Sequence, residues 1–208
     1  MPKLWSGTIE THRREVREAV LSTTAALAAE RGIASVTMSE IAERAGIGRA
    51  TLYKYFPDVE TILTAWHEHV VGEHLRELAA VRARPGTVWE RLAAVLEAYA
   101  FIHHERHGPR LVATLHGTSH RHHGDPSAKL NALLHRGEHV QHAQEELDTM
   151  IRDLIKSGVK EGRVRRDVAA DELATYCLHA LLAAGSLPSR GAVQRLVQVV
   201  LSGLKPAK

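Results

Sequence analysis

Apolar residues recur at helical spacing along nearly the whole chain, and no stretch alternates between apolar and polar residues as a half-buried strand does. The pattern predicts an all-α protein. Breaks fall at Pro85-Gly86, Gly108-Pro109 and Pro188, because proline and glycine interrupt helices. The polar segment 117–127 is predicted to be a surface loop. The predicted helices lie near 11–31, 58–82, 87–107, 127–160, 171–185 and 190–204, with two short helices within 37–56 and another ending near 116.

Residues 37–56 carry the most specific local pattern. Thr37 and Glu40 match a capping box, in which each side chain binds the backbone N–H of the other at a helix start. Gly46 stands where a helix ends in the left-handed conformation. In the following helix, Leu52 and Phe56 are four residues apart and share an inward face. Two short helices joined in this way predict a helix-turn-helix, whose second helix enters the DNA major groove.

The outward face of the second short helix suits a nucleic acid. From Arg49 to Phe56 there are two cations and no carboxylate. Arg49 can present its planar guanidinium to guanine, and Lys54 offers a point charge to a phosphate or a base. Neighbouring hydroxyls can bind phosphate oxygens. The alternative is a helical hairpin whose basic residues are only solvated. The expected DNA contacts are Thr37, Ser39, Arg49, Thr51, Tyr53, Lys54 and Tyr55.

Residues 12–63 resemble the DNA-binding domain of the TetR family of transcriptional regulators. The segment from Gly158 to Asp167 is similar to the family's usual link into its first dimerisation helix. Two positions depart from the family pattern: Gly48 stands where Ser is common, and Val59 where Lys is frequent, so each removes one possible phosphate contact. The residues that carry the resemblance are Ala29-Glu30-Arg31-Gly32, Val36 to Ala42, Ala45-Gly46-Ile47, Thr51-Leu52-Tyr53, Tyr55-Phe56, Glu60 and Leu63.

The resemblance implies a two-domain regulator. Residues 1–57 would form the helix-turn-helix DNA-binding domain, and residues 58–208 a helical effector-binding and dimerisation domain. The implied function is a homodimeric repressor that a small-molecule effector releases from a palindromic operator in double-stranded DNA. A ligand-independent DNA binder is the main alternative. We expect no cofactor and no enzymatic activity, because the chain has no Gly-rich phosphate loop, no G-x-S-x-G and no H-E-x-x-H motif.

The last two predicted helices each carry a wide apolar face. Their combined apolar surface exceeds what a short terminal hairpin can bury against its own chain, so pairing with a second copy would give a four-helix bundle with a two-fold axis. The alternative is that the core of the same chain covers both faces. The expected interface residues are Leu173, Tyr176, Cys177, Ala180, Leu181 and Ala184, and then Val193, Leu196, Val197, Val200, Leu201 and Leu204.

The middle of the chain, about 83–165, is where an effector would bind if the resemblance holds. An aromatic or leucine stripe at helical spacing is equally what any helical bundle needs for its core. The candidate lining residues are Trp66, Val70, Trp89, Leu92, Leu96, Tyr99, Leu111, Leu115, Leu134 and Met150.

Histidine is unusually abundant, with 15 copies. His135, His139 and His142 share one helix face, and His103 and His107 form a second pair at helical spacing. A metal-responsive regulator is therefore a second alternative. No cysteine accompanies these residues, so a polar helix surface is the simpler interpretation and we assign no metal site.

The remaining composition is that of an intracellular protein. Cys177 is the only cysteine, which excludes a disulfide framework within one chain, and it lies in an apolar helical run where we expect it to be buried and inert. No apolar run approaches the roughly 18 residues that a membrane span needs, and the N-terminus lacks the apolar core of a signal peptide. We therefore expect a cytoplasmic protein without a membrane partner.

Charge favours DNA by its placement rather than by its total. Residues 1–56 carry eight Lys or Arg against six Asp or Glu, and the remaining residues 19 against 18. Arg13, Arg14 and Arg17 lie at the start of the predicted lead helix, where cations oppose the helix dipole, so we expect DNA phosphate or solvent to balance them. The leading arm, with Lys3 and Trp5, is expected to become ordered only on DNA.

Overall fold

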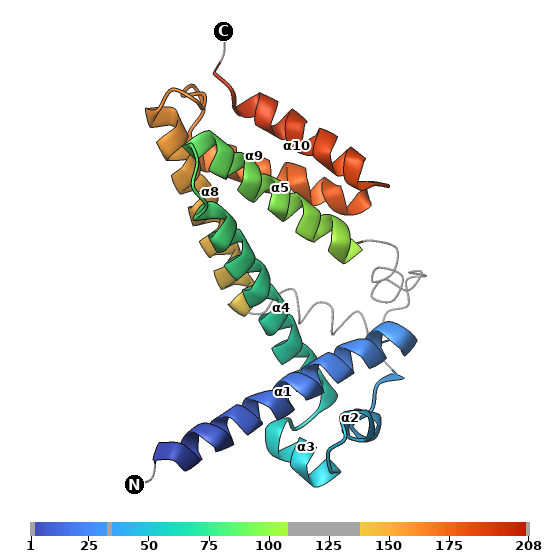
Figure 1. Ribbon diagram of the computed structural model, residues 1–208. Helices are drawn as coiled ribbons and strands as arrows, with labels where there is room; N and C mark the ends of the chain where they lie inside the picture. The colour runs from blue at the N-terminus through green and yellow to red at the C-terminus, as the bar shows by residue number, and fades with distance from the viewer. Residues whose placement is uncertain (1–2, 33–34, 108–137, 207–208) are drawn as a thin grey trace. The chain divides into compact units, whose positions relative to one another are not determined.

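A computed structural model describes residues 3–32, 35–107 and 138–206, without the side chains of 3–9 and 106–107. Every regular element in these ranges is helical, as the sequence predicts (Figure 1). The elements are α1 (Lys3–Arg31), α2 (Met38–Arg44), α3 (Arg49–Tyr55), α4 (Val59–Arg82), α5 (Val88–His107), α8 (Glu138–Lys160), α9 (Ala170–Leu182), the 3₁₀ turn η2 (Ala183–Ser186) and α10 (Arg190–Leu204). The predicted short helix near 116, the loop 117–127 and the start of the helix predicted at 127 lie outside the described residues.

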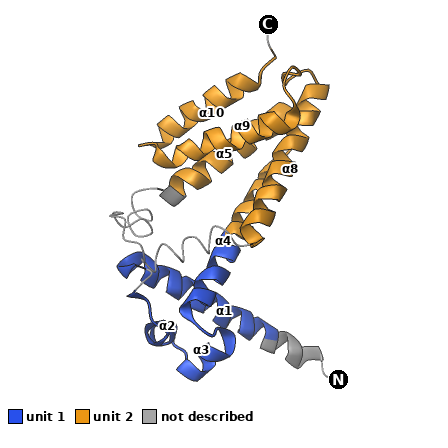
Figure 2. Cartoon of the chain, turned by 180° about the vertical axis from the view of Figure 1, so that it is seen from behind, with its two compact units in different colours: residues 1–70, 113–137 blue, residues 71–112, 138–208 orange. Residues whose placement is uncertain are grey.

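The described chain forms two compact units (Figure 2). Residues up to Val70 belong to the first unit, and the described residues from Val71 onward belong to the second. The division falls within α4, so one continuous helix supplies residues to both units.

The first unit has a small apolar core built from α1, α2, α3 and the first turns of α4. Ile41, Leu52 and Ile62 have no exposed surface, and Phe56 and Leu63 are 1% exposed. Helices as short as α2 and α3 are unstable alone, so this tertiary packing holds them in place. The remaining core residues are Val20, Leu21, Leu27, Ala28, Val36, Ala42 and Ala65.

The lead helix is longer than the sequence predicts. α1 begins at Lys3 rather than near residue 11, so the expected arm around Lys3 and Trp5 is helical. Arg13, Arg14 and Arg17 consequently lie well inside the helix, beyond its first two turns. The expectation that they oppose the helix dipole is wrong, because that effect is confined to the first turn.

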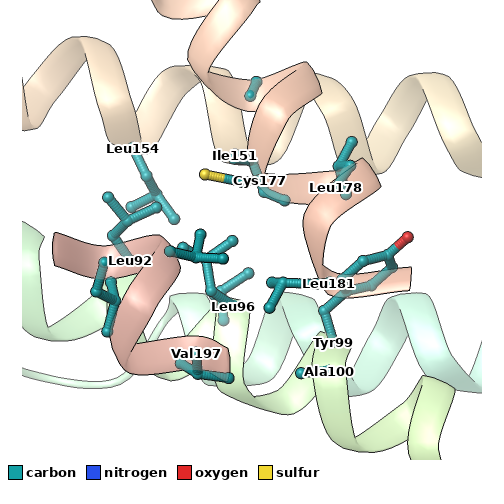
Figure 3. Packing of buried hydrophobic residues seen from close by; sticks show 14 of the residues in the cluster. Leu92, Leu96, Tyr99, Ala100, Ile151, Leu154, Cys177, Leu178, Leu181 and Val197 are labelled. Carbon is teal, nitrogen blue, oxygen red and sulfur yellow. The ribbon is translucent and has the colours of Figure 1, made fainter. Parts of the chain in front are cut away.

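The second unit has the larger core, to which α5, α8, α9 and α10 each contribute (Figure 3). In the close-up, Leu92 and Leu96 of α5 converge with side chains from the other three helices. The contributions from those helices include Ile151 and Leu154 of α8, Cys177, Leu178 and Leu181 of α9, and Val197 of α10. Burial raises the pKa of the Cys177 thiol to about 12, which agrees with its expected inertness.

A tight connection joins α8 to α9. A Cβ on Gly158 would lie 2.6 Å from Cγ2 of Val164, so only glycine lets this segment fold back so closely. Gly162 supplies the left-handed turn, with φ of 68°. The backbone N–H of Arg165 then donates to the carbonyl of Leu204 at 2.9 Å, which ties the connection to the end of α10.

Among the described residues, no helix combines the length and the apolar character that crossing a bilayer requires.

Candidate nucleic-acid interface

The capping box predicted for α2 is formed. The N–H of Glu40 donates to the Thr37 hydroxyl oxygen at 3.3 Å, and the Thr37 N–H donates to Oε2 of Glu40 at 3.1 Å. The Thr37 hydroxyl also donates to Oε2 of Glu40 at 2.9 Å. These bonds from Thr37 lower the pKa of the Glu40 carboxyl below its ordinary value. The Thr37 hydroxyl therefore caps the helix, and its expected role as a DNA contact remains a prediction.

The turn between α2 and α3 is a Schellman motif. Gly46 has φ of 69°, a conformation that side chains other than glycine rarely adopt. The N–H of Ile47 donates to the carbonyl of Ala42 at 3.0 Å, and that of Gly46 to the carbonyl of Glu43 at 3.1 Å. Gly48 then begins α3 without a side-chain cap. The Gly46 turn thus sets the direction in which α3 leaves α2.

Two ion pairs brace α2 against the end of α1. Nη1 and Nη2 of Arg44 donate to the two carboxylate oxygens of Glu30, at 2.6 and 2.5 Å. Nη1 of Arg31 donates to Oε1 of Glu40 at 2.9 Å. The hydrogen bonds from Arg44 lower the pKa of the Glu30 carboxyl, and the same pairing raises the pKa of Arg44. Exposed pairs stabilise little individually, but a bidentate pair also fixes geometry. Sequence spacing did not reveal this brace, because its partners are 14 and nine residues apart.

The outer face of α3 presents most of the residues expected to contact DNA. Arg49 and Lys54 are exposed, Tyr53 is 55% exposed, and Leu52 on the opposite face is fully buried. Ser39 of α2 and Thr51 and Tyr55 of α3 are half-buried. The helix therefore turns a positively charged, hydroxyl-bearing surface outward while its other face packs into the core.

The end of α3 is fixed from two directions. The guanidinium of Arg17 in α1 lies over the Phe56 ring, 5.0 Å from its centroid. Asp58 caps α4 by accepting from the N–H of Thr61 at 2.7 Å, a bond that lowers the pKa of the Asp58 carboxyl. Both contacts hold the chain where α3 gives way to α4.

The residues expected to line an effector site fall in different places. Trp66 packs against the core of the first unit, and Val70 is half-buried at the end of that unit. Leu92, Leu96, Tyr99 and Met150 belong to the core of the second unit, and Trp89 packs against that core. Leu111, Leu115 and Leu134 lie outside the described residues. An effector contact for any of them stays a prediction.

The residues expected at a dimer interface are largely inside the chain. Leu173, Cys177, Leu181, Val193, Val197 and Val200 are each at most 5% exposed in one copy. The premise that the terminal hairpin cannot bury both apolar faces is wrong, because α5 and α8 contribute to the same core. Large apolar side chains that these helices do expose are Tyr176 at 43%, Leu182 at 47% and Val199 at 63%.

The histidines do not assemble into a metal site within the described ranges. No group of three or more His, Cys, Asp or Glu side chains there is placed to hold a metal ion. His139 is half-buried and His142 is exposed on α8, while His135 and the histidines of 117–127 lie outside the described residues.

Two family models match the chain. Residues 20–65 match the family described as bacterial regulatory proteins, tetR family, which covers α2, α3 and parts of α1 and α4. Residues 110–206 match the family described as transcriptional regulator SbtR-like, C-terminal domain. The first match extends past residue 57 into α4, and the second takes in all of α8, α9 and α10, so the predicted domain boundary at residues 57 and 58 stays a prediction.

Similar proteins are also regulators. The HTH-type transcriptional regulator BetI of Brucella suis (strain ATCC 23445 / NCTC 10510) is 32% identical over 96 residues, which are 46% of this chain and 46% of BetI. The match thus spans about half the length of such curated relatives.

Solved structures resemble the chain over most of its length. A TetR/AcrR-family regulator from Thermobifida fusca is 20% identical with a TM-score of 0.70, over 90% of this chain and 97% of that chain. FadR from Bacillus subtilis, solved in complex with stearoyl-CoA, is 15% identical with a TM-score of 0.62, over 92% and 99%. At these identities the likeness shows the fold alone, and it confirms the predicted fold class.

Proposed function

The chain belongs to the TetR family of transcriptional regulators, and from this premise we propose that it binds a palindromic operator as a homodimer and leaves it when a small-molecule effector binds. The observation that carries the proposal is the outer face of α3, where Arg49, Tyr53 and Lys54 are exposed on a helix that a glycine turn and a buried face hold in place. The family is one of regulators rather than enzymes, so no catalytic role is proposed.

The contacts to DNA divide by chemistry. Arg49 opens α3, and a recognition helix presents its N-terminal residues to base edges, so we assign Arg49 to guanine. The hydroxyls of Ser39, Thr51 and Tyr55 suit phosphate oxygens, which fix register without reading sequence. Tyr53 and Lys54 can contact either a base or the backbone.

Dimerisation is proposed through the surface that α9 and α10 leave exposed. The Tyr176 hydroxyl lies 3.4 Å from where a Cβ on Gly203 would stand, so this glycine lets the ring lie close over α10. Val199 is one turn before Gly203 on the same helix and is 63% exposed. Tyr176 and Val199 therefore form an apolar surface that a second copy can cover, while the buried residues beneath them support it.

The effector would act through α4. This helix supplies Ile62 and Leu63 to the core of the first unit, and Leu78 and Val81 to the core of the second. A packed helix shifts as a body more readily than it bends, so a ligand in the second unit can displace residues of the first. Moving the two recognition helices away from the spacing of their half-sites would then weaken binding.

Selection of bound fragments from random-sequence duplex DNA tests the proposal. We expect an enriched inverted repeat whose half-sites lie about 10–10.5 base pairs apart, or a multiple of that distance. Failure to enrich any sequence would refute sequence-specific DNA binding.

A thermal-shift screen tests the effector proposal, and acyl-CoA molecules are a first panel because FadR was solved with stearoyl-CoA. For any molecule that binds, its affinity is measured with and without operator DNA. By linkage, an effector that releases DNA must bind the DNA-bound protein more weakly, typically by about 5–150-fold. Equal affinities would indicate a DNA binder whose second unit serves only to dimerise.

A further inference from the structure

A hollow lies beside the recognition helix, between α1 and the last turn of α3. It has a volume of about 630 Å³ and is lined by side chains from both helices. Arg13, Arg14 and Arg17 come from α1 with Glu10, while Lys54 and Tyr55 come from α3. Sequence alone could not place these two groups together, because about 40 residues separate them along the chain.

The charges in the hollow have one predominant sign. Glu10, Arg13, Arg14 and Arg17 follow the spacing i, i+3, i+4 and i+7, so they share one face of α1. Lys54 adds a fourth cation, against the single carboxylate of Glu10. Arg13, Arg14 and Lys54 are exposed, and the ion pair between Arg14 and Glu18 is long, at 4.0 Å. Their charged groups are therefore accessible to an anion from outside.

Arg17 and Tyr55 stand between this hollow and a second one. They also line a hollow of about 480 Å³ on the α4 side, whose other residues include Asp58, Glu60 and Glu68. The stacking of Arg17 over Phe56 keeps this dividing wall in place. The lining charges are thus mainly acidic on the α4 side and mainly basic on the α1–α3 side, which favours an anion on the α1–α3 side.

We propose that the α1–α3 hollow binds consecutive phosphate groups of a DNA strand while α3 lies in the major groove. The inference rests on the proposed function, and it assigns Arg13 and Arg14, outside the helix-turn-helix, to the DNA backbone. The hollow is open and larger than one phosphate group, which suits a passing polyanionic strand. It also adjoins the end of α3, whose first turn carries Arg49, the residue that we assign to a base.

Phosphate contacts of this kind supply affinity that does not depend on sequence. The test compares wild-type protein with the double variant Arg13→Gln/Arg14→Gln, and separately with Lys54→Gln. The matched control, Arg84→Gln/Arg166→Gln, removes the same two charges from exposed positions of the second unit, away from the proposed dimer surface of α10. Affinity is measured against a selected operator duplex and a random-sequence duplex over a series of salt concentrations.

The slope of log affinity against log salt falls in magnitude by about 0.9 for each phosphate that the protein no longer neutralises. A homodimer carries each change twice, so on the operator duplex we expect a decrease of about 3.6 for the double variant and about 1.8 for Lys54→Gln, with no change for the control. The double variant should bind both duplexes more weakly by the same factor. Circular dichroism should show unchanged helix content, because both arginines are exposed.

Three results would overturn this inference while the proposed function stands. One is an unchanged salt slope in the double variant. Another is a weakening confined to the operator duplex, which would make the arginines base readers. The third is arginine-dependent binding of inorganic tripolyphosphate with unaltered DNA affinity, which would indicate a small-anion site. If the wild type binds no duplex even at low salt, both proposals fail.

Discussion

The two units achieve their structures by different means. In the first, two local signals, a capping box at Thr37 and Glu40 and a left-handed turn at Gly46, act together with a bidentate pair between the more distant Glu30 and Arg44. In the second, long amphipathic helices meet over a core of side chains distant in sequence. The difference teaches that the two short helices of the proposed DNA-reading surface need directional bonds in addition to a small core, whereas the longer helices of the second unit meet over a larger core.

The largest expected effect tests whether the second unit depends on its apolar core for stability. Val197 is 2% exposed in α10, so Val197→Asp would bury a charge among apolar side chains. We expect a decrease on the order of 4–5 kcal/mol in the free energy of unfolding, measured by urea denaturation. A stable, fully helical variant would show that the packing of α10 is not needed.

Val199→Asp places the same charge two residues after Val197 on α10, at an exposed position instead of a buried one. Val199 is 63% exposed, so the fold of one copy should survive. If Val199 lies in the proposed interface, the change should weaken dimerisation by about 2 kcal/mol, read by sedimentation at several concentrations. Gln194→Asp, an exposed control on another face of α10, should leave the dimer intact. A dimer equally stable in all three proteins would exclude this surface.

Lowering the pH tests the ion pair between Arg165 and Asp167 in the second unit, which is bidentate like the pair between Arg44 and Glu30 in the first unit. Asp167 accepts from Nε and Nη2 of Arg165 at 2.8 and 2.6 Å, which lowers the pKa of the Asp167 carboxyl from 3.8 to about 2. Because the folded pKa lies below the unfolded one, this pair stabilises the fold above pH 3.8 and ceases to do so as pH falls to about 2.

Asp167→Asn should therefore flatten the dependence of unfolding free energy on pH across that window. Urea denaturation at stepped pH measures it, with the exposed Glu161→Gln as control. Identical pH profiles for wild type and Asp167→Asn would rule out the stabilising role of the pair.

The smallest expected effect concerns the uncapped start of α3. A Cβ on Gly48 would lie 3.8 Å from Oγ1 of Thr51, an ordinary contact, and the φ of Gly48 is −69°. Gly48→Ser should add a helix cap and raise stability by a few tenths of a kcal/mol. Differential scanning calorimetry would detect the small rise in Tm, and Gly48→Ala should lack it. A lower Tm for the Ser variant would mean that the cap does not form.

Sequence predicted the first unit well because its signals are local. The capping box, the turn at Gly46 and the inward pair Leu52 and Phe56 each depend on neighbours within a few residues. The pattern does not predict the start of α1, because residues 3–10 hold only Leu4, Trp5 and Ile9 as large apolar residues, with Gly7 between them, too few to establish a helical period.

In the second unit, the spacing of apolar residues predicts the helices but not how they pack. An amphipathic pattern predicts that one face of a helix is buried, but not which element covers that face. For this reason the sequence predicts Leu181 and Val193 at a dimer interface, whereas both lie in the core of the same chain. The pair Glu30 and Arg44, and the hollow that joins Arg13 to Lys54, likewise depend on folding across many residues. Such arrangements follow from tertiary packing, which spacing along one helix does not encode.

The central claim is that α3 reads DNA sequence, and Arg49→Ala tests it most directly. Affinity is measured for an operator duplex selected by the wild type and for a random-sequence duplex at one salt concentration. We predict that the variant loses about 1–3 kcal/mol of discrimination between the two, while its affinity for random DNA changes little. An equal weakening on both duplexes would contradict the account, because Arg49 would then contact the backbone and α3 would not read bases through it.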